Sequence, residues 1–180
     1  MLDHGANTEL GFREGTALTR ACILGHGGIT ELLLKSGAGV NTRNFDGSTA
    51  LHAAAYHGHK GSTLRLLQAG SQVDVADEQG ITALIKAAWG GHAEVAELLL
   101  DHGADIHWMA DDGDTPLRRA LISNHYQVVR CLIQRGARAD IGNRDGNTAL
   151  SYAKLYDGCP GYELICGLLK EWEEMHRRDD

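Results

Sequence analysis

Apolar and small residues recur along the chain in pairs of short clusters, and polar, glycine-containing stretches separate the pairs. In one pair, Leu51 and Ala54 stand three residues apart, and the adjacent Leu66 and Leu67 belong to the following cluster. Apolar residues spaced by three and four indicate amphipathic helices. The pattern therefore predicts two short helices per unit, and neither helix can bury its apolar face alone.

The pattern returns every 33 residues, in five units. Each unit opens with threonine, then alanine or proline, then leucine; the threonines are Thr16, Thr49, Thr82, Thr115 and Thr148. A threonine at this place predicts an N-cap, whose hydroxyl accepts a hydrogen bond from a free backbone N–H. Units repeated in one register predict a stack in which neighbours bury a continuous core.

Glycines mark the predicted ends of both helices. The first helix is followed by Gly25, Gly58 and Gly91, and Asn124 takes that place in the fourth unit. Glycine and asparagine both tolerate the left-handed conformation that commonly ends a helix. A second glycine column ends the second helix, and a third stands two residues before threonine, where it predicts a tight turn; these are Gly37, Gly70, Gly103 and Gly136, then Gly47, Gly80, Gly113 and Gly146.

With these columns the sequence resembles the ankyrin repeat family. Residues 47–59 and 98–106 match the family pattern closely, and the resemblance covers nearly the whole chain. It implies an all-α solenoid of stacked helix-turn-helix units with β-turn or hairpin-like loops. Some units depart from the pattern: only Pro116 keeps the family's proline, only His52 keeps the histidine after leucine, and Glu14 replaces a loop glycine.

We expect one domain, 1–180. Its units are a partial repeat at 1–12, repeats at 13–45, 46–78, 79–111 and 112–144, and a C-terminal capping repeat at 145–180. Residues 2–7 mirror 100–105, so we expect the chain to begin near the end of a second helix, as a fragment of a longer array or with its true start upstream. The last interhelical link is longer than the others, and we expect Trp172 and Met175 to cover the end of the core.

Charge narrows the classes of function. The chain has 17 basic and 24 acidic residues and a net charge of −7. Binding to nucleic acids or to anionic membranes draws on an excess of lysine and arginine. We therefore expect neither nucleic acid nor membrane as a partner. No apolar run approaches a membrane span, and Met1-Leu2-Asp3-His4 does not read as a signal peptide. The four cysteines include no C-x-x-C pair, which favours reduced thiols. We expect an intracellular, cytoplasmic protein, with the nucleus as an alternative.

Candidate chemistry is weak. Successive units stack about 8–10 Å apart, too far for one zinc ion to bridge the column of His26, His59, His92 and His125. We expect these histidines to hydrogen-bond the loops between units. The aspartates at 111, 112 and 114 are interpreted as a solvated loop tip rather than a cation site. No nucleophile elbow or phosphate-binding loop is present. We therefore expect no metal, no cofactor and no catalysis; an enzyme with an unrecognised site is the remote alternative.

Surface positions carry the functional prediction. In the ankyrin family partners contact the loop tips and the outward residues of the first helices, on the concave face. These positions vary between units here, whereas the core positions repeat. The resemblance implies a non-catalytic, monomeric module that binds another protein; the alternative is an ankyrin part of a larger signalling, scaffold or effector protein that makes intramolecular contacts. The candidate partner-binding residues are Phe45, Tyr56, Ile81, Trp89, Trp108, Asp111, Asp112, Asp114, Arg119 and Ile122.

One modification is implied by the same resemblance. Asparagine hydroxylation is known in the ankyrin family at the position that Asn41 occupies, after Val40. The equivalent positions of the later units hold Asp74, His107 and Asp140. A mass shift of one oxygen on the Asn41 peptide is the test.

Overall fold

The computed structural model describes residues 15–176 and, within that range, contains ten helices and no strand. They follow one another in pairs: α1 (Ala17–Ile23), α2 (Gly27–Lys35), α3 (Ala50–Tyr56), α4 (Lys60–Gln68), α5 (Ala83–Gly90), α6 (Ala93–Asp101), α7 (Pro116–Ile122), α8 (Tyr126–Gln134), α9 (Ala149–Leu155) and α10 (Glu163–His176). The predicted all-α solenoid of helix-turn-helix units is confirmed. The proposed partial repeat at 1–12 lies outside the described residues.

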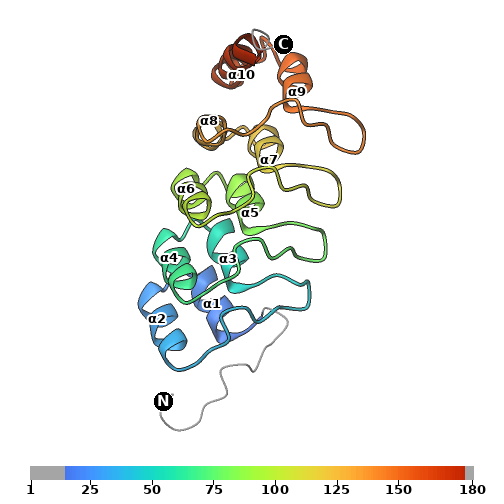
Figure 1. Ribbon diagram of the computed structural model, residues 1–180. Coiled ribbons are helices and arrows are strands. Elements are labelled where there is room, and N and C mark those ends of the chain that lie inside the picture. Colours follow the sequence, from blue (N-terminus) through green and yellow to red (C-terminus); the bar gives the residue numbers. More distant parts are fainter. Residues whose placement is uncertain (1–14, 177–180) are drawn as a thin grey trace.

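The pairs stack into an elongated molecule with two layers of helices (Figure 1). The odd-numbered helices form one layer and pack on one another in chain order, and the even-numbered helices form the second layer. Hairpin-shaped loops project from the odd-numbered layer to one side, so that loops and helices together form an inner wall (Figure 1). The predicted repeat boundaries at 45/46, 78/79 and 111/112 fall within these hairpins. These boundaries stay a prediction.

The core lies between the layers and between successive units. The leucines of the repeated Thr-Ala/Pro-Leu segment are at most 1% exposed in the first four units: Leu18, Leu51, Leu84 and Leu117. One column of the odd-numbered helices is fully buried against the next unit: Cys22, Ala55, Ala88 and Leu121. Three of these four residues are small, and small side chains let adjacent helices approach closely enough to exclude water.

Threonine caps start the odd-numbered helices, with one exception. The hydroxyls of Thr16, Thr115 and Thr148 accept from the backbone N–H three residues later, as expected. At Thr49 the backbone N–H donates to Nδ1 of His52, 3.1 Å away. The hydroxyl of Thr82 is buried and has no hydrogen-bond partner within the described range, so the expected cap contact is wrong there.

The histidine column joins one unit to the next, as predicted. Nε2 of His59, His92 and His125 lies 3.0 Å from a backbone carbonyl oxygen at the end of the odd-numbered helix in the preceding unit. Those carbonyls have no partner inside their own helix ends, so each histidine satisfies an exposed helix terminus. The column therefore stabilises the stack.

The hairpin loops also contact one another. Within a hairpin, the N–H of Asp77 donates to the carbonyl of Ile81 over 2.9 Å, and the hairpins of the other units close in the same way. Between hairpins, the N–H of Glu78 donates to the carbonyl of Asp46 and that of Asp111 to the carbonyl of Gln79. Gly113 has a φ of +82°, and a Cβ there would meet the backbone N of Arg144 at 2.6 Å. The tips thus form one connected edge.

The C-terminal unit closes the stack differently. Trp172 is 6% exposed and covers the core end, as predicted, whereas Met175 is 58% exposed, so its predicted covering role is wrong. Met175 lies in the last turn of α10. Lys154 occupies the column that is fully buried in the preceding units and is exposed, paired with Glu173 at 2.9 Å.

Candidate functional site: the inner wall and its groove

One column of apolar residues on the odd-numbered helices stays exposed, or partly exposed in the case of Ile23. It occupies the same place near the C-terminal end of each helix: Ile23, Tyr56, Trp89, Ile122 and Leu155. Tyr56 and Trp89 are each 41% exposed, although the core leucines and alanines of their helices are buried. Large apolar groups that remain exposed along one face of a monomer commonly mark an interaction surface.

This exposed column, which we call the anchor column, is held rigidly by the histidines. The carbonyls that His59, His92 and His125 contact belong to Ile23, Tyr56 and Trp89. The backbone of each of these anchor residues is therefore fixed by the following unit. A surface held in this way loses little conformational entropy when it binds.

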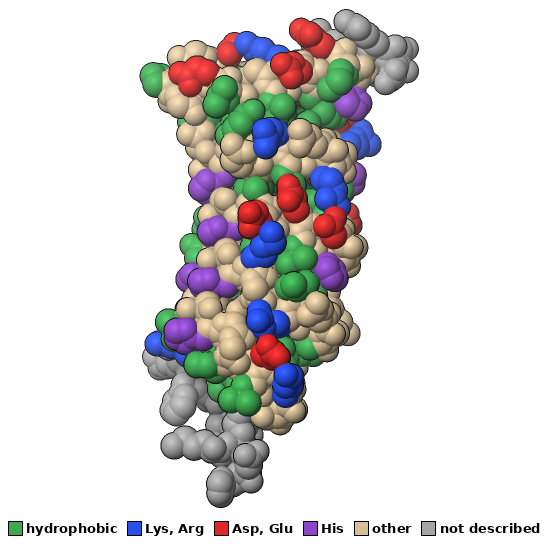
Figure 2. All heavy atoms as spheres, turned by 90° about the vertical axis from the view of Figure 1, so that its left-hand side faces the viewer, with side chains coloured by type: hydrophobic (Ala, Val, Ile, Leu, Met, Phe, Trp, Pro, Cys, Tyr) green, Lys and Arg blue, Asp and Glu red, His purple; other side chains and the backbone are tan. Residues whose placement is uncertain are grey.

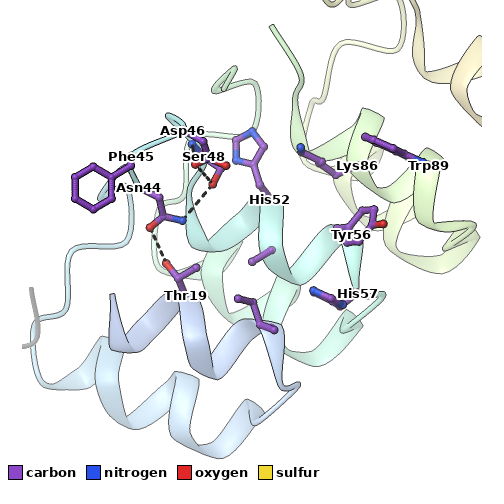
Figure 3. A pocket seen from close by; sticks show the side chains of 12 residues that line it. Thr19, Asn44, Phe45, Asp46, Ser48, His52, Tyr56, His57, Lys86 and Trp89 are labelled. Carbon is purple, nitrogen blue, oxygen red and sulfur yellow. Dashed lines mark hydrogen bonds between the residues drawn. The ribbon is translucent and has the colours of Figure 1, made fainter. Parts of the chain in front are cut away.

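A groove of about 480 Å³ opens on this wall between α1, α3, α5 and the first complete hairpin (Figure 3). Phe45 stands at the hairpin side, and Tyr56 and Trp89 stand at the helix side (Figure 3). The lining mixes apolar and polar side chains; it consists of Thr19, Ile23, Asn44, Phe45, Asp46, Ser48, His52, Ala53, Tyr56, His57, Lys86 and Trp89. Binding pockets commonly combine an apolar lining with a few placed polar groups.

The groove exists because one residue in the second unit is small. Ala53 shares its repeat position with Arg20, Lys86 and Arg119 of the neighbouring units. Those residues carry long basic side chains, whereas alanine ends at Cβ. The wall is therefore hollow at the second unit.

Trp89 is oriented by its neighbours. The rings of Tyr56 and Trp89 meet edge to face, with centroids 5.9 Å apart and planes at 81°. The ammonium of Lys86 and the guanidinium of Arg119 lie 5.9 Å and 5.4 Å from the Trp89 ring centroid. Edge-to-face pairs and cations over an indole ring are both favourable arrangements. Trp89 is thus pre-positioned beside the groove rather than free to turn.

The polar end of the groove rests on His52, which is 3% exposed. Its Nδ1 accepts from the N–H of Thr49, so Nε2 carries the proton and donates to the carbonyl of Ile81, 3.0 Å away. Burial lowers the pKa of His52 below its ordinary value, against the opposing effect of the bond to Ile81. Both ring nitrogens are used, so His52 is a neutral structural element and not a base.

The basic side chains of the wall are neutralised within the molecule. Nζ of Lys86 lies 3.1 Å from Oδ2 of Asp77. Nε of Arg118 lies 2.6 Å from Oδ1 of Asp114, and both side chains are buried. Arg119 pairs with Asp112 and also with Asp114. These pairs connect hairpins to helices.

The structure brings some predicted partner-binding residues together and separates others. Phe45, Tyr56 and Trp89 line the same groove, and Ile122 extends the anchor column. Arg119 packs over Trp89 and pairs with Asp112, which is exposed at its hairpin tip like Asp111.

Two of those residues were expected at the surface and are buried. Ile81 is 2% exposed and packs with Ile85 and Ala110, because the residue before the capping threonine turns toward the next hairpin. Asp114 is 6% exposed, and its carboxylate pairs with Arg118 and Arg119. Their expected exposure is wrong. Trp108 is partly buried, packs against the Ile81 cluster and donates from Nε1 to the carbonyl of Gly80 over 2.8 Å. A partner contact by Trp108 stays a prediction.

Sequence reasoning missed the residues that shape the groove. Ala53, His52 and Lys86 line it and were not among the candidates. A signal for Ala53 was present, since it is the only small residue in a column of Arg20, Lys86, Arg119 and Tyr152. His52 was noted only as the one residue that keeps the family's histidine after leucine, and that feature did not mark it as part of a groove.

Other sites are not supported by the described residues. No group of three or more histidine, cysteine or carboxylate side chains within 15–176 is placed to hold a metal ion. Within the same range, no helix is both long and apolar enough to cross a membrane. Asn41 bridges to the next unit: its Oδ1 accepts from the N–H of Gln72 and its Nδ2 donates to the carbonyl of Gly70. Its hydroxylation stays a prediction.

Paired helices, hairpins in register and a continuous core define a helical repeat protein with a stiff inner wall. Comparison with protein families agrees: the model "Ankyrin repeats (3 copies)" matches residues 18–109 and 102–179. The chain belongs to the ankyrin repeat family. A comparison with curated proteins finds no match.

Proposed function

We propose that this chain is a non-catalytic, intracellular module that binds a partner protein on its inner wall, with the groove at the second and third units as the centre of the interface. Ankyrin repeats are generally protein–protein interaction modules. The observation that carries the proposal is the anchor column, in which Tyr56 and Trp89 stay 41% exposed beside a hollow of about 480 Å³.

The chemistry of the wall supports binding rather than catalysis. Tryptophan and tyrosine are enriched among residues that dominate binding energy, and such residues cluster near the centre of an interface. Charged pairs such as Arg119–Asp112 lie at its margin. Two of the titratable groups in the groove are engaged: His52 uses both nitrogens, and Lys86 is paired with Asp77.

The far layer of the stack offers a contrast. Its surface mixes side chains of both charge signs with apolar groups (Figure 2). Single exposed apolar residues such as Leu32, 56% exposed, occur there too. Scattered apolar residues are ordinary on protein surfaces, whereas the anchor column is aligned along the stack and adjoins the groove.

Affinity capture tests the proposal. The full chain and its Trp89→Ala variant are immobilised separately, and proteins from a lysate that only the wild type retains are purified and their affinities measured. Leu164→Ala is the matched control, because Leu164 is 66% exposed on α10 and lies outside the groove. We expect the control to retain the same proteins as the wild type. Equal retention on wild type and Trp89→Ala would count against this interface.

A further inference from the structure

The hairpin edge carries a row of acidic side chains. Asp46, Glu78, Asp111 and Asp145 are exposed, one on each of four successive hairpins, and none of them forms an ion pair with another described residue. We call these four residues the acidic row. The four hairpins, residues 43–48, 77–81, 110–114 and 143–147, contain seven acidic residues and two basic ones. The edge therefore presents negative charge beside the groove.

The basic side chains nearby form no ion pair with the row, although Lys86 acts on Asp46 through its charge. Lys86, Arg118 and Arg119 are paired with acids other than those of the row. Of the two basic residues on the hairpins, Arg43 donates from Nη2 to the carbonyl of Ala76, and Arg144 is exposed on the fourth hairpin, beyond the groove. A partner that brings acidic groups would have to break the internal pairs, and leaving a buried charge unpaired is costly.

Asp46 links the acidic row to the groove. It lines the groove, next to Phe45, which is 81% exposed. Oδ1 of Asp46 accepts from the N–H and the hydroxyl of Ser48, over 3.0 Å and 2.6 Å. Partial burial raises the pKa of Asp46, but these hydrogen bonds outweigh it and hold the pKa below its ordinary value. The carboxylate is ionised at neutral pH, and Oδ2 is available to a partner.

Resting on the proposed function, we infer that the occupant of the groove is an extended basic peptide segment of the partner with one aromatic or aliphatic anchor. The anchor side chain packs against Tyr56 and Trp89. A lysine or arginine side chain of the segment lies over the exposed ring of Phe45 and pairs with Asp46, since cations favour aromatic faces. Further basic residues pair with Glu78 and Asp111.

The spacing of the units suits such a segment. Stacked helices lie about 8–10 Å apart, and an extended chain advances about 3.3 Å per residue. A basic residue at every third position of the segment therefore meets successive carboxylates of the acidic row. This register predicts the sequence pattern of the occupant without naming the partner.

A random peptide library displayed on phage, selected on the full chain, tests the inference. We expect recovered peptides to combine an aromatic or aliphatic residue with two or more lysines or arginines. Their affinity, measured by fluorescence anisotropy with synthetic peptides, is expected to fall about ten-fold between 50 mM and 500 mM salt, because exposed charge pairs are screened. Replacing the basic residues of a recovered peptide by glutamate is expected to abolish binding.

Charge variants of the chain give the matched measurement. Glu78→Gln and Asp111→Asn are each expected to weaken such a peptide about two- to five-fold, the size of an exposed ion pair. Glu97→Gln is the control, because Glu97 is an exposed carboxylate on α6, in the far layer of the stack. Equal losses from Glu97→Gln and from the two row variants would overturn the inference.

The outcomes separate this inference from the proposed function. If the recovered peptides are acidic or uncharged and lose their binding to Trp89→Ala, the basic occupant is wrong and the proposed interface is retained. Peptides that bind wild type and Trp89→Ala equally would overturn both. Recovery of no peptide would overturn the peptide occupant. A wild-type dimer in sedimentation, with Trp89→Ala monomeric, would overturn it too, because a second copy of the chain would then fill the groove.

Discussion

The second unit and the C-terminal unit use the same repeat positions in opposite ways. At one position, Ala53 leaves the wall hollow, whereas Tyr152 fills the wall by stacking on Tyr156 with ring centroids 4.5 Å apart. At another, Ala55 is fully buried against the next unit, whereas Lys154 faces solvent and pairs with Glu173. A single repeat position therefore serves packing, binding or closure according to the residue that occupies it.

The fold and the site have separate requirements. Stacking needs small or apolar residues where units meet, because interiors are close-packed. The groove needs a small residue on the wall and large exposed ones beside it. Since different columns meet these needs, the binding surface can change between units while the stack is preserved.

The largest effect on stability is expected when the second unit receives, at Ala55, the lysine that the C-terminal unit carries there as Lys154. Ala55→Lys places a long charged side chain where Ala55 is 0% exposed. Overpacking and an unpaired buried charge should lower the free energy of unfolding by about 3 kcal/mol or more. Urea denaturation followed by far-ultraviolet circular dichroism measures it. A loss below about 1 kcal/mol would show that the interface between units accommodates a lysine side chain.

The next effect concerns the anchor. Trp89→Ala is expected to weaken the binding of a captured partner by about 2 kcal/mol, as for a central tryptophan, and to leave the helical circular dichroism unchanged. Leu155→Ala removes the end-unit member of the same column, which is 74% exposed and lies outside the groove. Calorimetric titration should show a much smaller change for Leu155→Ala. Similar losses would mean that the whole column binds evenly.

Filling the groove should also weaken binding. Ala53→Arg gives the second unit a residue that the fourth unit already carries at that position as Arg119. We expect about ten-fold weaker binding, near 1.4 kcal/mol, because the added side chain occupies the hollow. The thermal midpoint should stay close to that of the wild type, which distinguishes a filled groove from a damaged fold. Undiminished binding would place the interface elsewhere.

Acidification should destabilise the central units. Burial lowers the pKa of His52 from 6.5, and burial also lowers the pKa of His92. The unfolded chain then takes up protons first, so stability falls as the pH drops below about 6.5 toward the folded-state values. Denaturation midpoints at pH 7.5 and 5.5 measure the loss, and His52→Gln should reduce its pH dependence. An unchanged dependence would assign the loss to other groups.

The smallest effect is expected at the end of the stack. Lys154→Ala removes an exposed ion pair with Glu173, and such pairs contribute about 0–1 kcal/mol. Lys154 is 61% exposed, and the carboxylate of Glu173 that is left behind keeps 20% of its side chain exposed, so water can still reach it. The free energy of unfolding should change by less than about 1 kcal/mol, in contrast to Ala55→Lys. A large loss would show that the end unit depends on this contact.

Much of the fold followed from the sequence because repeated columns carry local physics. Threonine caps, left-handed Gly25 and Asn124, and the histidine column are all decided within one unit and its neighbour. Thr82 is the exception among the caps, since its hydroxyl has no partner there. The site was predicted in part: the resemblance to the ankyrin family implied the outward positions of Phe45, Tyr56 and Trp89, and the structure adds that they line one groove.

What the sequence determined by itself was the period, the helix pairs and the register of the stack, because each depends on residues that are close along the chain. Only the tertiary structure decided which outward positions stay exposed. Ile81 and Asp114 turned inward because a neighbouring hairpin and two arginines cover them. The groove beside Ala53 likewise depends on contacts between units, and exposure is a property of such contacts rather than of any one residue.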